Sequence, residues 1–240
     1  FQFSFRCADS TLGLYKLVSG NAFEIGSDGV YDLNPEGDRR NPNAVGISVG
    51  YCGDVTGDGL NDILFGAPNI QAEGAAYVVT NQTIQALTKE EKIVSIDWIE
   101  ANYGVRVAGI AKDDDCGWAV SGAGDFNGDG INDVLIGASA ADINGKENAG
   151  EVYLIFGGPQ LGVCGQLEPE RLSGADGVRI QGTEAYGFAG WSIAAAGDLN
   201  ADGYDDIIIG APHEDASGEN SGAVYIVYGG PTLGAGGKFS

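Results

Sequence analysis

Oxygen-bearing side chains recur at one spacing in three short stretches of the sequence, and this spacing suits a hard cation. The middle copy reads Asp125-Phe-Asn127-Gly-Asp129-Gly-Ile131-Asn-Asp133. Each copy has such side chains at its first, third, fifth and ninth positions, with glycine at the sixth, where the chain must turn sharply. Calcium takes about 6 to 8 oxygen ligands, one of them commonly a backbone carbonyl at the seventh position. The pattern therefore predicts three Ca²⁺ sites.

The predicted ligands of each site are four side chains and the carbonyl oxygen of the seventh residue. They are Asp54, Thr56, Asp58, Asp62 and the carbonyl of Leu60; Asp125, Asn127, Asp129, Asp133 and the carbonyl of Ile131; and Asp198, Asn200, Asp202, Asp206 and the carbonyl of Tyr204. An EF-hand loop begins in the same way but has Glu at its twelfth position, between two helices. Here the twelfth positions are Phe65, Ile136 and Ile209. Short β-branched runs flank the loops, so we expect each loop to join two strands of a β-hairpin. Plain solvated Asp-Gly turns are the alternative, which three copies in register disfavour.

Composition and charge exclude several classes of partner. The chain has 240 residues, is 43% hydrophobic and carries a formal net charge of -22. Such an acidic chain is not expected to bind nucleic acid or anionic membrane surfaces. No run approaches the roughly 18 apolar residues of a membrane-spanning helix, so we predict a soluble protein without membrane insertion.

The cysteines and the first residue favour an extracellular or cell-surface location. The sequence begins with Phe1 and contains no Met, so either a leader has been removed or the chain is a piece of a longer protein. Four cysteines, an even number, suit disulfides in a secreted protein, and three pairings are possible. They are Cys7, Cys52, Cys116 and Cys164. A buried free thiol at Cys52 is the alternative. Asn81 begins a glycosylation sequon.

The three loops begin 71 and 73 residues apart, which indicates a repeat architecture. In each repeat a Gly/Ala/Ser-rich strand leads into the loop, an apolar strand leaves it, and a third strand follows. A fourth is expected at 104–109 and 177–182, with a counterpart at 21–26, and a short helix at 82–91. Small residues on one strand of every repeat suit a crowded centre where strands converge. We predict an all-β fold of β-propeller blades rather than a sandwich or a parallel β-helix.

Two short motifs extend this prediction to a known family. Phe156-Gly157 and Tyr228-Gly229, with Gly66-Ala-Pro68 and Gly210-Ala-Pro212, resemble the FG-GAP repeat of integrin alpha-chain propellers and their bacterial relatives. In that family the acidic loop joins the first two strands of a blade and holds calcium, as the resemblance implies here. The sequence departs from the pattern at Val79-Thr80, Ser139 and Thr56.

The predicted organisation is a single propeller region, 1–240, with three repeats. An N-terminal segment (1–40) holds an outer strand and precedes repeats at 41–110, 111–182 and 183–240, the last without its own fourth strand. Propellers typically close with about 4 to 8 blades. Either the N-terminal strand of one copy completes the last blade of another, so that a dimer forms six blades, or the chain belongs to a longer propeller.

The function predicted from these features is that of a binding module. Calcium would stabilise the hairpins, and loops on one face would bind a protein or glycan ligand, as in adhesion. The alternative is a structural subunit of a surface layer, filament or matrix. We expect no enzyme, because a Gly46-Ile-Ser48-Val-Gly50 motif lies inside a predicted strand and the one histidine is His213. Trp118 and Trp191 are expected to pack in the core or between blades, with the lining of a ligand pocket as the alternative.

Overall fold

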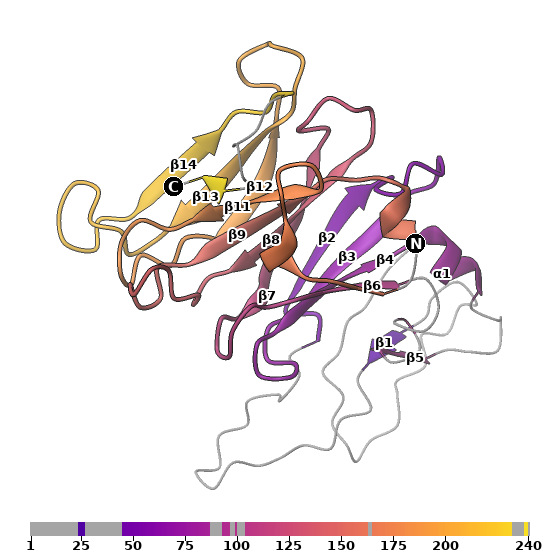
Figure 1. The fold of residues 1–240 in the computed structure, drawn as a ribbon, viewed down its shortest axis with the longest axis horizontal. Helices are drawn as coiled ribbons and strands as arrows, with labels where there is room; N and C mark the ends of the chain where they lie inside the picture. The colour runs from indigo at the N-terminus through magenta and orange to yellow at the C-terminus, as the bar shows by residue number, and fades with distance from the viewer. Residues whose placement is uncertain are drawn as a thin grey trace, which may run out of the picture.

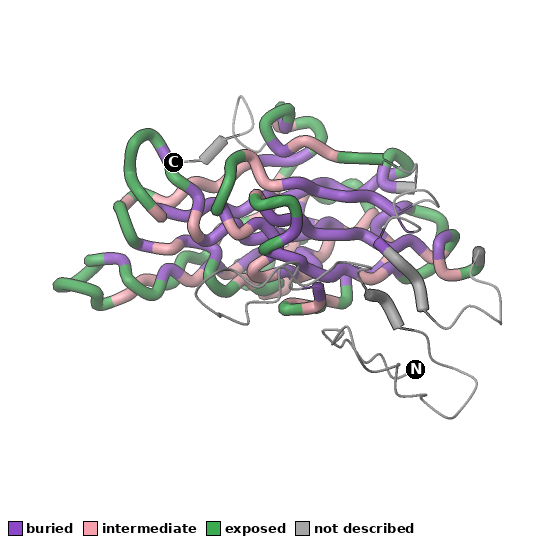
Figure 2. The backbone as a smooth tube through the Cα atoms, turned by 90° about the horizontal axis from the view of Figure 1, so that it is seen from below, coloured by how far each residue is buried: buried purple, intermediate pink, exposed green. Residues whose placement is uncertain are grey.

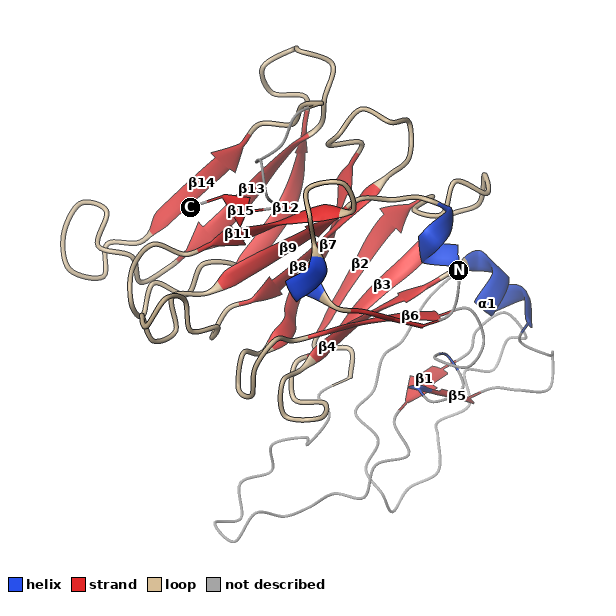
Figure 3. Cartoon of the chain, viewed as in Figure 1, coloured by secondary structure: helices blue, strands red, loops and turns tan. Residues whose placement is uncertain are grey.

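The computed structural model describes residues 24–26, 45–86, 93–96, 99, 104–162, 165–231 and 238–239. Its main feature is three antiparallel β-sheets that lie side by side, as Figure 1 shows. Little helix accompanies them (Figure 3): α1 (Asn81–Ala86) and the 3₁₀ helices η1 (Pro159–Gly162) and η2 (Pro169–Arg171). The predicted helix at 82–91 is thus confirmed up to Ala86, and residues 87–91 lie outside the described residues.

Each sheet corresponds to one predicted repeat, and the all-β prediction is confirmed. Blade 1 consists of β2 (Ser48–Gly53), β3 (Asp62–Ala67), β4 (Ala75–Val79) and β6 (Gly104–Ala108). Blade 2 consists of β7 (Cys116–Gly124), β8 (Asp133–Ala138), β9 (Glu151–Ile155) and β11 (Gly177–Gln181). Blade 3 consists of β12 (Ser192–Gly197), β13 (Asp206–Ala211) and β14 (Ala223–Val227). The order of strands within each blade matches the order along the chain, as the meander of a propeller blade requires.

The core lies between the blades, where apolar faces of neighbouring sheets meet. Strands β4, β8 and β9 are buried along their whole length, which explains their nearly continuous Val, Leu and Ile content. One cluster joins Leu64 and Val78 of blade 1 to Ile136 and Tyr153 of blade 2. A second cluster joins blade 2 to blade 3. Figure 2 shows this buried interior as a continuous purple band along the middle of the chain.

Glycine lets the second strand of one blade approach the inner strand of the next blade closely. A Cβ atom on Gly66 of β3 would lie 1.9 Å from the carbonyl oxygen of Gly117, and one on Gly137 of β8 would lie 2.3 Å from that of Gly190. Ser48 adds a hydrogen bond across the same gap, donating from Oγ to the Gly117 oxygen at 2.8 Å. The crowded centre predicted from the small residues is therefore present.

Short parallel strands extend the blades at their outer edges, and the sequence did not predict them. The connection between β9 and β11 sends β10 (Gly165–Leu167) back to pair with β6 of blade 1. In the same way β15 (Lys238–Phe239) pairs with β11 of blade 2. A third parallel pair, in a sheet of its own, joins β5 (Ile93–Ser95) to β1 (Glu24–Gly26), which lies within the strand predicted at 21–26. Strands of two or three residues carry no hydrophobic alternation, so pattern reading misses them.

Two sequence-based expectations are modified by the structure. The described part of the predicted N-terminal outer strand, Glu24–Gly26, pairs with β5 of its own chain. Cys52 and Cys116 are buried free thiols, and burial raises the pKa of both; Cys7 and Cys164 lie outside the described residues. None of the helices that the structure describes is long and apolar enough to cross a membrane.

Candidate metal centre

The three acidic loops occupy equivalent positions, each between the first and second strands of its blade. They cover residues 54–62, 125–133 and 198–206. The first Asp of each loop accepts hydrogen bonds from backbone N–H groups further along the loop. Asp125 accepts them from Gly128 and Gly130 at 2.8 and 3.0 Å, and Asp54 accepts them from Gly57 and Gly59, both at 2.7 Å. The loop therefore curls around its own first carboxylate.

Backbone geometry explains the glycine at the sixth position of each loop. Gly59, Gly130 and Gly203 have φ values of 85°, 89° and 95°, a region that side chains with a Cβ rarely adopt. The turn brings the third and fifth side chains together: Asn127 Nδ2 donates to Asp129 Oδ2 at 2.9 Å, and the equivalent bond in the third loop measures 2.8 Å. In the second and third loops the first, third and fifth predicted ligands thus gather near the loop tip, whereas in the first loop Thr56 is buried and donates to Asp54 Oδ1 at 3.3 Å.

The ninth-position Asp has a different environment from the other predicted ligands. Asp62, Asp133 and Asp206 are fully buried, and both oxygens of each carboxylate accept a backbone N–H bond. For Asp133 the donors are Phe126 at 2.9 Å and Gly157 at 2.8 Å. Asp62 and Asp206 bind the equivalent groups at 2.8 to 3.1 Å. This carboxylate joins the start of the loop to the end of the third strand, a structural role that the spacing alone did not reveal.

The carboxylates within one loop influence one another electrostatically. The pKa of Asp133 is raised to about 7, mainly by burial; the two N–H bonds act against this rise, and the negative charges of Asp129 and Asp125 add to it. Burial likewise raises the pKa of Asp62 to about 6, with contributions from Asp58 and Asp54. Burial also acts to raise the pKa of Asp54, but N–H donors led by Gly59 outweigh it and hold that pKa below its usual value. Each loop concentrates negative charge that a cation would neutralise.

The donor chemistry of the loops fits calcium better than a transition metal. Carboxylate, amide and hydroxyl oxygens are ligands for hard cations, and neither histidine nor thiolate is among them. Across the described ranges no three His, Cys, Asp or Glu side chains are close enough to hold a metal ion by themselves. A calcium ion would therefore draw on amide and carbonyl oxygens as well as on the exposed carboxylates. The fifteen predicted ligands stay a prediction.

Backbone hydrogen bonds connect neighbouring loops on the same rim of the sheets. The N–H of Asn132 donates to the Asp54 oxygen at 3.1 Å, and the N–H of Asp205 donates to the Asp125 oxygen at 3.2 Å. Asp205 also accepts the N–H of Asp125 at 2.8 Å through its side chain. Sequence analysis missed Asp205, which occupies a position where the other loops have Asn. The loops form a linked row, so ordering one of them restrains the next.

An aromatic cluster lies toward the opposite rim. Trp118 lies near the start of β7 and Trp191 immediately precedes β12, each seven residues before the first Asp of a loop, or roughly 23 Å along a strand. Their rings lie 4.8 Å apart, and Phe188 lies 5.8 Å from Trp191. The predicted packing between blades is present, but Trp191 stays 42% exposed. On adjoining segments, Glu147 accepts a bond from Tyr186, and the buried Glu214 accepts one from Thr183 at 2.7 Å.

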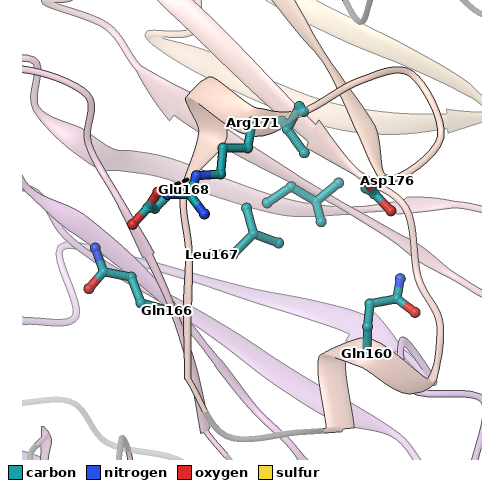
Figure 4. Close-up of a pocket in the computed structure, with 8 residues that line it drawn as sticks. Gln160, Gln166, Leu167, Glu168, Arg171 and Asp176 are labelled. Atoms are coloured by element: carbon teal, nitrogen blue, oxygen red, sulfur yellow. Dashed lines mark ion pairs between the residues drawn. The ribbon is translucent and has the colours of Figure 1, made fainter.

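A separate cavity of about 270 Å³ lies at the outer edge of blade 2 (Figure 4). Ile155, Leu167 and Leu172 form its apolar lining, and its polar lining consists of Gln160, Gln166, Glu168, Arg171 and Asp176. The one guanidinium group is paired with Glu168 at 2.7 Å. None of the predicted metal ligands lines this cavity.

Comparison with known proteins identifies the class. Residues 117–155 and 189–227 each match the FG-GAP repeat, and each match spans the first three strands of a blade with its acidic loop. Integrin alpha pat-2 of Caenorhabditis briggsae is 30% identical over 75% of this chain and 14% of its own length. Integrin alpha-8 of Mus musculus is 32% identical over 78% of this chain and 15% of its own length. The chain belongs to the FG-GAP repeat, integrin-alpha-like family, and it is an integrin-like β-propeller module.

The comparisons also correct the expectation that the protein is not an enzyme. Phosphatidylinositol-glycan-specific phospholipase D of Bos taurus is 30% identical over 74% of this chain and 20% of its own length. The same repeat region therefore occurs in an enzyme, and that prediction was wrong. The error has a physical reason: the matched part is the FG-GAP repeat region, so the absence of a catalytic motif there does not describe a whole protein. The chain spans about 13 to 20% of the length of the curated relatives it matches.

Proposed function

We propose that this chain is the binding module of an extracellular adhesion protein, with calcium in the acidic loops and a ligand on the opposite rim. The assignment to an integrin-like adhesion module is supported by the family. Relatives named integrins and phosphatidylinositol-glycan-specific phospholipase D share its repeats. Calcium binding, secretion and a protein or glycan ligand are proposals.

The observation that carries the ligand proposal is the aromatic cluster across blades 2 and 3. The half-exposed indole of Trp191, with the Trp118 ring tilted against it by 51° and the Phe188 ring edge-on at 85°, offers an exposed aromatic face on which a sugar ring or an apolar side chain can stack. Rim loops supported by rigid strands are a common place for binding residues.

Calcium is proposed to stabilise the three acidic loops, which lie on one rim of the sheets. Ions bound only by the folded state stabilise it by RT ln(1 + [L]/Kd), about 2.7 kcal/mol per site at a hundredfold excess over Kd. Because the loops are joined by backbone hydrogen bonds, neutralising one loop also restrains its neighbour. This would keep the inner strands, and therefore the aromatic cluster at their other ends, in a fixed arrangement. A second copy or further blades of a longer propeller are proposed to cover the remaining apolar sides.

The ligand proposal is tested by presenting the chain, in millimolar calcium, to one panel of extracellular matrix proteins and one panel of glycans. We expect a member of either panel to bind, and Trp191→Ala to weaken that binding at least about tenfold, or 1.4 kcal/mol. Arg171→Ala, at the exposed outer edge of blade 2, is the matched control and should bind as the parent chain does. The proposal fails if nothing binds, or if Trp191→Ala binds with unchanged affinity.

A further inference from the structure

The eighth residue of the third acidic loop reaches the loop of the preceding blade. This residue is Asp205, which is half-buried, and its Oδ2 atom accepts the N–H of Asp125 at 2.8 Å. Asp125 is the first predicted ligand of the second loop, where its own carboxylate accepts the N–H groups of Gly128 and Gly130. A carboxylate of blade 3 therefore lies next to the calcium site proposed for blade 2.

The junction between the first and second loops has the same backbone arrangement but a different side chain. At both junctions the N–H of the eighth residue donates to the backbone oxygen of the neighbouring loop's first Asp, at 3.1 Å from Asn132 and at 3.2 Å from Asp205. Each side chain also lies against the glycine just before that Asp, Gly53 for Asn132 and Gly124 for Asp205. The two junctions therefore differ by one negative charge.

Further contacts hold the third loop against the second. A Cβ atom on Gly128 would lie 2.3 Å from Cε1 of Tyr204, so the Tyr204 ring covers this part of the second loop. Beyond the end of β14, the N–H of Gly230 donates to the Phe126 oxygen at 2.9 Å. The carboxylate of Asp205 is therefore held beside the second loop by packing as well as by its own hydrogen bond.

From this geometry we propose that Asp205 is a positioning residue for the calcium site of the second loop, although it belongs to the next blade. Its carboxylate fixes the backbone of Asp125, and its negative charge favours a cation in the second loop. The first loop has the neutral Asn132 in the equivalent place and lacks this added charge. The inference rests on the proposed binding of calcium to the loops, and it states which residue outside a loop adjusts the affinity of that loop.

A calcium titration followed by NMR tests the proposal, because one glycine N–H in each loop reports that loop alone. The reporters are Gly59, Gly130 and Gly203, each of which donates to the first Asp of its own loop. Asp205→Asn keeps an acceptor oxygen, removes the charge and makes this junction resemble that of Asn132. We expect it to raise the calcium midpoint read at Gly130 about fivefold, the effect of one charge interaction in water-like surroundings. The midpoint read at Gly59 should not change.

The reverse exchange, Asn132→Asp, is the matched variant that adds a charge. Its carboxylate would lie beside Gly53 and the first predicted ligand of the first loop. We therefore expect the midpoint read at Gly59 to fall about fivefold. In Asp205→Asn the midpoint read at Gly203 should change less than that at Gly130, because the Asp205 side chain is directed to the neighbouring loop.

Salt and temperature separate the effect of the charge from a merely structural role. Raising the salt concentration from about 0.1 M to about 1 M shortens the Debye length from about 10 Å to about 3 Å. The difference between the parent chain and Asp205→Asn at Gly130 should therefore shrink at high salt. In EGTA the variant should melt at no lower a temperature than the parent chain, because Asn keeps the acceptor for the Asp125 N–H.

Three results would overturn the proposal. If calcium shifts all three glycine signals but Asp205→Asn leaves the Gly130 midpoint unchanged, this inference fails and the proposed calcium sites stand. If the glycine signals of the parent chain do not respond to calcium, both fail. A midpoint that rises as much at Gly203 as at Gly130 means that Asp205 acts on its own loop, which also contradicts the proposal.

Discussion

Asp133 and Asp129 belong to the same predicted calcium site, yet the structure gives them separable roles. Asp133 is fully buried and its two oxygens accept the N–H groups of Phe126 and Gly157. Replacing it by Ala leaves both donors buried without a partner, at about 1–3 kcal/mol each. We therefore expect Asp133→Ala to lower the free energy of unfolding, measured in EGTA, by about 2–6 kcal/mol. For a chain of this size that corresponds to a fall in melting temperature of roughly 4–24 °C.

Asp129→Ala should behave in the opposite way. Its carboxylate lies at the exposed loop tip, where it accepts bonds from Asn127 and the N–H of Ile131 that water can replace. We expect less than about 1 kcal/mol of destabilisation in EGTA, but the loss of calcium stabilisation worth about 2.7 kcal/mol at a hundredfold excess over Kd. Thermal melts of both variants with and without calcium measure the difference. Equal melting temperatures for the two variants in EGTA would refute the structural role of Asp133.

Three further substitutions test the fold. Burial raises the pKa of Asp114 to about 6, so the folded state binds this proton more tightly than the unfolded chain does. The folded state therefore loses stability as the pH rises from about 4 to 6. Asp114→Asn should raise the melting temperature at pH 8 and leave it unchanged at pH 4. Arg179 makes a bidentate ion pair with the buried Glu151, with N–O distances of 2.8 and 2.9 Å. Arg179→Lys should therefore lower the free energy of unfolding, measured by denaturant titration, by about 1–3 kcal/mol. An unchanged denaturation midpoint would contradict the role of this pair. Gly66→Ala should unfold at a markedly lower temperature, because the new Cβ would collide with the inner strand of blade 2. A melting temperature equal to that of the parent chain would show that the two strands can move apart at no cost.

Much of the fold could be predicted because each repeat has the same strand and loop motifs. The strands after each loop are runs such as Ile207-Ile-Ile209, and the fourth strands share Gly-Val-Arg, so three or two copies in register reinforce a weak signal. The parallel strands β10 and β15 could not be predicted, because their pairing involves backbone groups and only two or three residues. The blades themselves were predictable, and the way each connection reaches back to the preceding blade was not.

The candidate site was predicted in composition but not in the division of roles. Spacing placed the ninth Asp among the ligands, but spacing cannot show that its two oxygens accept buried N–H groups from a segment 24 residues away, as Asp133 does from Gly157. Nor could the sequence show that Asp205 bonds to the neighbouring loop. Packing of Trp118 and Trp191 between blades was predicted, but their contact with each other was not. Contacts between repeats depend on how the blades are stacked, and a single repeat carries no record of that.

Titration of the calcium-stripped chain with CaCl₂ in an isothermal calorimeter tests the central claim most directly. The account predicts three calcium ions bound per chain, and two per chain for Asp129→Ala. Thermal melts of the same samples should show the melting temperature rising as the sites fill. Absence of binding heat together with an unchanged melting temperature, or a stoichiometry that Asp129→Ala leaves unaltered, would contradict the assignment of calcium to these loops.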